Sequence, residues 1–178
     1  MMLKHTLHSS IAQTTIMKKL EIDLKYIEQL SKERSAENIV FQTYLKKQDS
    51  VKIDEIVHRL YKEVESEIDC RDCGNCCQNL RPIASHKELR PFVAEENIES
   101  VMYAESIQCM HHKNKVCTDY LNRPEECRLF PYLGEDNFIE KTYSAIINYR
   151  ICPHVFNVFE LLKTELEWDY KNVANVKK

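Results

Sequence analysis

Eight cysteines are the feature that most constrains how this chain can fold, and all of them lie between Cys70 and Cys152. Cysteine at about a tenth of such a window is the density of a disulfide-linked scaffold or of a metal-binding domain. The residues before and after this window contain no cysteine. We therefore expect the middle of the chain to be organised by its sulfur atoms.

The N-terminal sequence favours metal binding over disulfides, because disulfides need an oxidising compartment. The apolar residues of MMLKHTLHSSIAQTTIMKK are scattered among polar ones and do not form the continuous core of a signal peptide. No stretch of the sequence approaches the roughly 20 apolar residues that span a membrane. These features predict a cytoplasmic chain that does not associate with membranes and whose thiols bind metal or take part in redox chemistry.

Composition excludes two classes of function. The formal net charge of −3 argues against nucleic-acid binding through a broad basic surface. Gly74 and Gly134 are the two glycines of the chain, whereas a P-loop needs two in one short loop and a dinucleotide fingerprint needs three. A glycine-rich nucleotide cradle is thus excluded. No acid–base pair stands out, so the sequence leaves open whether the protein is an enzyme.

Apolar spacing predicts helices on both sides of the cysteine window. One runs from Ile16 to about Leu30, and a second from Ala36 to Lys47, with Ile39, Val40 and Tyr44 facing inward. A third begins at Asp49 or Ser50, and its inward stripe consists of Ile53, Ile56, Val57, Leu60 and Val64. A C-terminal helix starts with Pro153 in its first turn and continues to about Glu167.

Within the window, local signals predict short elements. Residues 70–77 read as a tight loop in which Gly74 adopts a positive φ. Ser85 and Glu88 form a capping box that opens a short helix, and a further helix runs from about Glu95 to Ser106. Residues 109–117 read as two extended arms around a polar turn.

The fold class predicted from these signals is mostly α with a minor β hairpin. We expect an N-terminal helical region at residues 1–69 and a small, irregular, metal-organised domain at 70–153. A C-terminal helix and tail complete the chain at 154–178.

The cysteine spacing predicts metal ligation. Cys70-x2-Cys73-x2-Cys76 turns three thiols toward a common centre, as in zinc ribbons and iron–sulfur proteins. Cys77 directly follows Cys76 and points elsewhere, which indicates two adjacent sites or a polynuclear centre. We hypothesise that Cys152 joins the three thiols of Cys70-x2-Cys73-x2-Cys76 and makes a first set of four. The second set would then be Cys77, Cys109, Cys117 and Cys127.

Other residues of the window are candidates for supporting roles. Four thiolates around Zn²⁺, or around an oxidised four-iron cluster, leave a net charge of −2, which is costly to bury without compensation. We expect Arg123 and Arg128 to face the metal region as donors behind the ligands. His111, His112 and His154 could bind metal, but with eight thiols present we expect them to lie outside the ligand sets.

Two motifs in order carry a family resemblance. Cys70-x2-Cys73-x2-Cys76-Cys77 is followed by Cys117-x2-Tyr120-x2-Arg123-Pro124-x2-Cys127-Arg128-x-Phe130-Pro131. Residues 68–153 thereby resemble the CxxCxxCC family, the YkgJ-type cysteine cluster proteins, which are described as zinc- or iron-chelating domains. The resemblance implies one or two sites for zinc or an iron–sulfur cluster, and does not cover the N-terminal helices.

The expected function is metal binding, with an iron–sulfur cluster in an electron-transfer or redox role toward a protein partner. One alternative is a structural zinc module that mediates protein–protein interaction. Another is an iron-dependent enzyme that acts on a protein substrate. The adjacent Cys76-Cys77 pair and the Cys152-Pro153 ending favour iron–sulfur.

Overall fold

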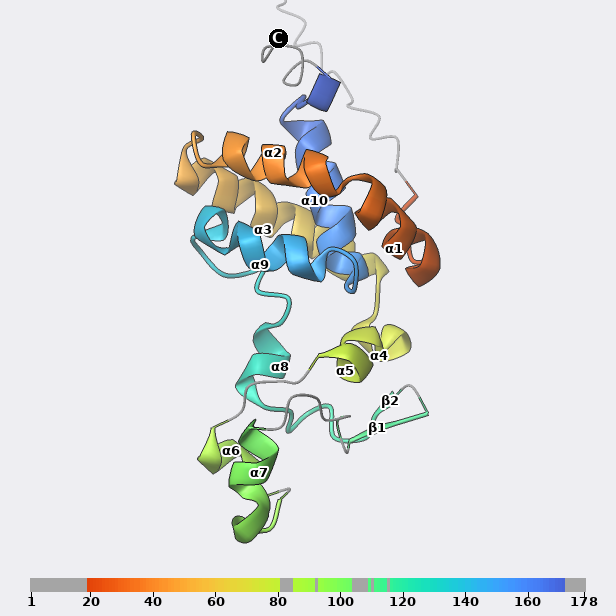
Figure 1. The fold of residues 1–178 in the computed structure, drawn as a ribbon, viewed down its shortest axis with the longest axis vertical. Coiled ribbons are helices and arrows are strands. Elements are labelled where there is room, and N and C mark those ends of the chain that lie inside the picture. The colour runs from red at the N-terminus through yellow and green to blue at the C-terminus, as the bar shows by residue number, and fades with distance from the viewer. Residues whose placement is uncertain are drawn as a thin grey trace, which may run out of the picture.

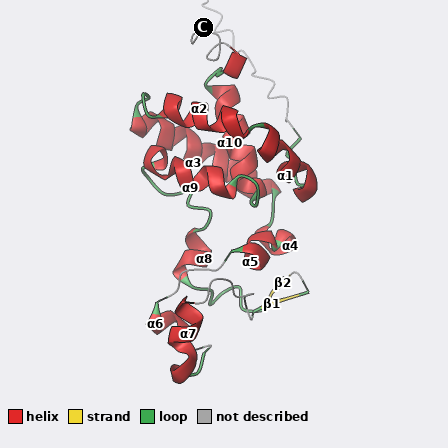
Figure 2. Ribbon diagram, viewed as in Figure 1, coloured by secondary structure: helices red, strands yellow, loops and turns green. Residues whose placement is uncertain are grey.

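The computed structural model describes residues 19–80, 85–91, 93–103, 109, 111–114 and 116–171, and it has two regions (Figure 1). The helical body comprises α1 (Leu24–Glu33), α2 (Ser35–Leu45), α3 (Ser50–Glu67), α9 (Phe138–Asn148) and α10 (Pro153–Glu165). The cysteine lobe, residues 70–131, contains α4 (Cys70–Cys73), α5 (Asn75–Asn79), α6 (His86–Leu89), the 3₁₀ turn η1 (Glu95–Asn97), α7 (Ile98–Tyr103), β1 (His112–Lys113), β2 (Val116–Cys117) and α8 (Glu125–Leu129). Helices dominate and the strands form one small hairpin (Figure 2), which confirms the predicted fold class. Within the described residues, no helix is both long and apolar enough to cross a bilayer.

One apolar core holds the helical body together. Helix α10 packs on α1, α3 and α9, while α2 packs on α1 and α9. Phe159 of α10 is fully buried, and its ring contacts those of Phe41, Phe138 and Tyr149. The predicted stripe on α3 is confirmed, since its members are buried or, at Ile56, partly buried.

The first helix begins later than predicted. Ile16 lies outside the described residues, and α1 starts only at Leu24, because the Asp23 side chain accepts hydrogen bonds from the backbone N–H groups of Lys25 and Tyr26. The Asn157 side chain of α10 exchanges two hydrogen bonds, of 2.8 and 2.9 Å, with the Glu21 backbone. This contact keeps the segment before α1 out of the helix.

The predicted inward face of α2 was wrong at Ile39, whereas Tyr44 packs partly buried against the core and Val40 is half-buried. Ile39 is 56% exposed, whereas Asn38, Phe41 and Leu45 are buried. A polar contact explains why the Asn38 face is buried. The Lys163 ammonium of α10 donates to the Asn38 side chain at 2.6 Å, which turns the face that carries Asn38 toward the core.

The helix starts predicted for α3 and α10 are confirmed. Asp49 accepts from the Lys52 backbone N–H and caps α3, and Pro153 occupies the first turn of α10. Helix α10 ends at Glu165 and not at Glu167, because Glu167 adopts a left-handed φ of 49°.

In the cysteine lobe one sequence-based prediction was wrong, that of a tight loop, and three are confirmed: the positive φ of Gly74, the capping box and the hairpin. Residues 70–77 are not a tight loop but the helical turns α4 and α5, joined by Gly74 at the predicted positive φ, 58°. The capping box of Ser85 and Glu88 is present. The predicted hairpin is confirmed, with His112 opposite Cys117. The helix predicted to reach Ser106 begins with η1 and continues as α7 to Tyr103; residues 104–106 lie outside the described residues.

Helices α8 and α9 were not anticipated from the sequence. Helix α9 lies within the span predicted as the cysteine domain, yet it packs on α2 and α3 of the helical body. The division of the chain at residues 69 and 153 stays a prediction.

Candidate metal centre

The helical body holds two distant cysteine segments beside one another. Helix α3 leads through Ile68 into α4, and Cys152 precedes α10. The Asn75 side chain of α5 donates to the Ile151 carbonyl at 2.7 Å. One ring nitrogen of His154 lies 3.0 Å from the Ile68 carbonyl, and the other lies 3.9 Å from the Cys70 sulfur. These contacts bring the cysteines of α4 and α5 next to Cys152.

The first group of thiols, which we call the body-side quartet, is Cys70, Cys73, Cys76 and Cys152. Burial raises the pKa of the Cys70 thiol to about 11, and the nearby charge of Cys73 raises it further. Burial likewise raises the pKa of Cys152, with the charges of Cys70 and Cys73 adding to the effect. The charges of Cys70 and Cys73 therefore both act on Cys152.

The second group, the hairpin-side quartet, is Cys77, Cys109, Cys117 and Cys127. Cys109 precedes the hairpin and Cys117 ends its strand β2, which packs against α4, while Cys127 lies on α8. Burial raises the pKa of Cys127 to about 11, and the charges of the other three thiols raise it further. Burial also raises the pKa of Cys109, which senses the charges of Cys77 and Cys117.

The two quartets meet at Cys76 and Cys77. A hydrogen bond between these adjacent thiols raises the pKa of Cys76 and lowers the pKa of Cys77. The charges of Cys152 and Cys70 also raise the pKa of Cys76, which ties it to the body-side quartet. The division into these two sets of four, like metal ligation by these residues, stays a prediction.

Backbone N–H groups near two of the sulfurs offset part of the effect of burial on their pKa values. Those of Val155 and His154, at the start of the 13-residue helix α10, act to lower the pKa of Cys152, and those of His111 and His112 act to lower that of Cys109. The His112 N–H itself donates to the Cys109 carbonyl at 2.9 Å. Such donors, and the positive end of a helix dipole, stabilise thiolate charge. Burial outweighs these N–H groups at both thiols, so the net pKa of Cys152 and of Cys109 is raised.

The three histidines differ in their surroundings. His154 is 2% exposed, and burial lowers its pKa, which favours a neutral ring. His112 is 8% exposed, and its Nε2 is screened from solvent without a hydrogen-bond partner. The charge of His112 lowers the pKa of Cys77, so the ring lies near the hairpin-side quartet. His111 precedes it in the same turn.

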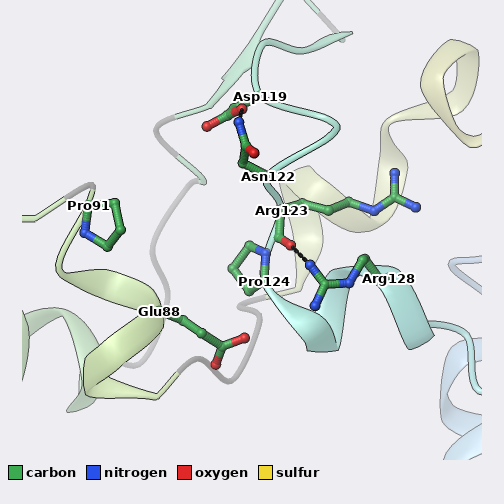
Figure 3. A pocket seen from close by; sticks show the side chains of 7 residues that line it. All are labelled: Glu88, Pro91, Asp119, Asn122, Arg123, Pro124 and Arg128. Carbon is green, nitrogen blue, oxygen red and sulfur yellow. Dashed lines mark hydrogen bonds between the residues drawn. The ribbon is translucent and has the colours of Figure 1, made fainter.

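Arg123 and Arg128 occupy different positions. The Arg123 guanidinium carbon lies 3.6 Å from the centroid of the Tyr120 ring, and its charge lowers the pKa values of Cys70, Cys77 and Cys127. Arg128 is exposed and donates to the Arg123 carbonyl at 2.6 Å, as the dashed line in Figure 3 shows. Arg123 therefore faces both groups of thiols, whereas Arg128 supports its backbone.

A cavity of about 480 Å³ adjoins this region, between α6 and the segment that leads into α8 (Figure 3). Its lining consists of Glu88, Pro91, Asp119, Asn122, Arg123, Pro124 and Arg128. The Glu88 carboxylate accepts from the backbone N–H groups of Glu125 and Ser85, which lowers its pKa to about 2. Glu88 therefore connects α6 to α8, which carries Cys127.

The donor set suits zinc or iron. All eight cysteines lie in the described residues and all are free thiols. Thiolate sulfur is the common ligand of structural zinc sites and of iron–sulfur clusters. As placed in the described part of the chain, no three Cys, His, Asp or Glu side chains come close enough together to hold an ion. The thiols are thus gathered within electrostatic reach of one another without forming a closed coordination shell.

Three supporting contacts were missed by sequence reasoning. The hydrogen bond from Asn75 to Ile151, the link from Glu88 to α8 and the stacking of Arg123 on Tyr120 all join residues through the folded structure. The sequence signal available for the last was the spacing Tyr120-x2-Arg123.

Comparison with known proteins identifies the cysteine segment. Residues 69–153, slightly under half of the chain, match the family model CxxCxxCC, described as a "Putative zinc- or iron-chelating domain". No curated protein and no solved structure matches the chain. The family resemblance predicted from the two motifs is confirmed over the span expected. The segment from residue 69 to residue 153 is therefore similar to the CxxCxxCC family, whose members are described as zinc- or iron-chelating domains.

Proposed function

We propose that the chain binds two iron–sulfur clusters, one in each quartet, and passes electrons to a protein partner in the cytoplasm. The observation that supports the proposal is the gathering of segments that carry eight free thiols: α5 contacts the Ile151 carbonyl before Cys152, and the hairpin strand β2 packs against α4. Neighbouring clusters of this kind would allow an electron to move between them. Backbone N–H donors at Cys109 and Cys152 would stabilise the sulfur charge of a bound cluster.

A structural zinc module is the second candidate, and one observation favours it. Among the described residues of the cysteine lobe, the buried apolar side chains are Ile98 and, at the lobe's end, Pro131. Small regions with so little core commonly need a metal to fold. Zinc in both quartets would supply that stabilisation without redox chemistry, and the lobe would then serve protein–protein contact.

Metal and acid-labile sulfide analysis of protein prepared without oxygen separates the two candidates. A brown protein with equal iron and sulfide, at the level of two clusters, supports the iron–sulfur proposal. A colourless protein with two zinc ions per chain supports the zinc module. Protein that holds neither metal contradicts both.

Two cysteine variants test the quartets separately. Cys73→Ser should lose the body-side centre and Cys127→Ser the hairpin-side centre, each halving the metal content. Leu121→Ser, at a side chain of the lobe that is 89% exposed, is the matched control and should keep its full content. If both cysteine variants retain all their metal, the ligand assignment is wrong.

A further inference from the structure

His154 is held in one orientation where α3, α4 and α10 meet. It lies in the first turn of α10 and is 2% exposed. One ring nitrogen, Nε2, lies 3.0 Å from the carbonyl oxygen of Ile68, the capping residue at the end of α3. The ring also packs edge-on against Tyr61 of α3, with 6.0 Å between the ring centroids. These contacts leave the imidazole little freedom to turn.

The contact with Ile68 determines which ring nitrogen carries the proton. A carbonyl oxygen can only accept a hydrogen bond, so Nε2 carries the proton and donates it to this bond. In the neutral ring the other nitrogen, Nδ1, then has a free lone pair. Nδ1 lies 3.9 Å from the Cys70 sulfur. The fold therefore places an electron-pair donor beside a thiol of the body-side quartet.

The distance between these two atoms suits a pair of ligands on one metal ion. Zinc binds sulfur at about 2.3 Å and imidazole nitrogen at about 2.0–2.1 Å, so at a tetrahedral angle the two donor atoms lie about 3.6 Å apart. The observed 3.9 Å is slightly longer, so a small approach would close the pair onto an ion. A metal-bound histidine commonly donates its second ring N–H to a backbone carbonyl, as His154 does to Ile68.

Metal binding by Cys70 would change what Nδ1 faces. A metal-bound thiolate has no proton to donate, so its sulfur would meet the Nδ1 lone pair unless the ring gained a proton or bound the metal itself. Charging a ring that is 2% exposed is costly. A neutral imidazole in place of one thiolate instead makes the net charge of a zinc or iron–sulfur site less negative by one unit. Burial therefore favours ligation over protonation.

We propose that Nδ1 of His154 binds the metal of the body-side site together with the Cys70 sulfur, as a pair on one zinc ion or on one iron of a two-iron cluster. Two of the three remaining thiols of the body-side quartet would supply the other protein ligands in either case. The inference rests on the proposed binding of metal by this quartet. It departs from the sequence-based expectation that His154 lies outside the ligand sets.

Cadmium NMR tests this ligand directly, because a ¹¹³Cd nucleus couples through the bond to a nitrogen that binds it. The full chain, labelled with ¹⁵N in its histidines, is reduced, stripped of metal and refilled with ¹¹³Cd²⁺, which takes thiolate and imidazole ligands. We expect a coupling between one cadmium ion and the Nδ1 of a histidine whose Nε2 keeps its proton. His154→Gln should lose this coupling and release cadmium from the body-side site to a chelator at least about tenfold more readily.

Two further variants separate ligation from a structural role of the ring. His154→Cys places a thiol close to the position of Nδ1, so it should hold cadmium without the nitrogen coupling. A ring needed only for packing or for its bond to Ile68 would not be replaced by a thiol. His58→Gln is the matched control, since His58 lies on α3 and pairs with exposed Asp136 at 3.9 Å. It should keep both the coupling and the wild-type release of cadmium.

The outcomes separate the ligand from the function on which it rests. Should His154→Gln fail to fold, the wild-type spectrum and His154→Cys carry the test. Wild-type protein that fills both quartets without any nitrogen coupling, or with a coupling that persists in His154→Gln, would overturn the role of His154 and leave metal binding intact. Wild-type protein that binds no cadmium in the body-side quartet would contradict the proposed function at that site.

Discussion

The helical body and the cysteine lobe are stabilised in different ways. The body buries one continuous core of apolar side chains from five helices, centred on Phe159. In the described part of the lobe, Ile98 and Pro131 are the buried apolar side chains, and Ile98 lies outside that core. Phe130, at the end of the lobe, is partly buried against it. Hydrophobic burial therefore accounts for the body, while the lobe depends on its short hydrogen-bonded turns and on whatever its thiols bind. The two regions should respond differently to the same treatment.

Metal removal should have the largest effect, and it should be confined to the lobe. Stripping the metal with a chelator under reducing conditions should unfold residues 70–131, because little apolar surface remains to hold them. Hydrogen exchange read by mass spectrometry should show lost protection in α4, α5 and α8 and retained protection in α3 and α10. Equal loss in both regions, or no loss in either, would contradict this division.

Phe159→Ala should have the converse effect. Its ring is fully buried against Phe41, Phe138 and Tyr149, so truncation should cost about 3–5 kcal/mol of unfolding free energy. Denaturant unfolding measures the loss, and metal content should stay at the wild-type level. Tyr143→Ala, at a side chain that is 66% exposed, is the control and should change stability little.

Lys163→Met tests a polar part of the body core. The buried ammonium donates to Glu37, Asn38 and Glu160 at 2.6–2.8 Å, so its removal leaves acceptors without a donor. We expect a loss of about 3 kcal/mol in the same denaturant experiment. Unchanged or increased stability would mean that apolar packing alone holds α2 against α10.

Two helix caps provide the smallest and sharpest comparison. Asp49→Ala removes the cap of α3 and should lower the unfolding free energy of the body by about 1 kcal/mol. Ser85→Ala removes the cap of α6 in the lobe and should destabilise that helix by a similar amount. The change should be seen only as faster hydrogen exchange of the backbone amides of residues 86–89. A shift in the body transition caused by Ser85→Ala would show that the two regions unfold as one unit.

The body was predictable where burial follows a simple period. The stripe on α3 is apolar at each inward position, so its spacing alone indicated the helix and its face. The apolar spacing did not predict the buried face of α2, because Asn38 is buried where it accepts a hydrogen bond from Lys163, a residue far away in the sequence. Helix α9 was missed because its buried face includes Thr142 and Ala145, which interrupt the apolar pattern.

Sequence spacing predicted which cysteines form the candidate site, and their role as ligands stays a prediction; the contacts that support the site were less predictable. Sulfur spacing indicated which cysteines could share a centre, since it depends on local geometry. The helical form of α4 and α5 was not foreseen, because turns of four and five residues show no period. The contacts of Asn75 and Tyr120 depend on how separate segments meet, which a single sequence does not indicate.

X-ray absorption at the metal edge of oxygen-free protein tests the central claim most directly, because it identifies the atoms bound to the metal. Coordination by thiolates in both quartets predicts four sulfur neighbours per metal ion at about 2.3 Å, with inorganic sulfide among them if clusters are present. A shell made mainly of oxygen or nitrogen would contradict the claim that these eight thiols are the ligands.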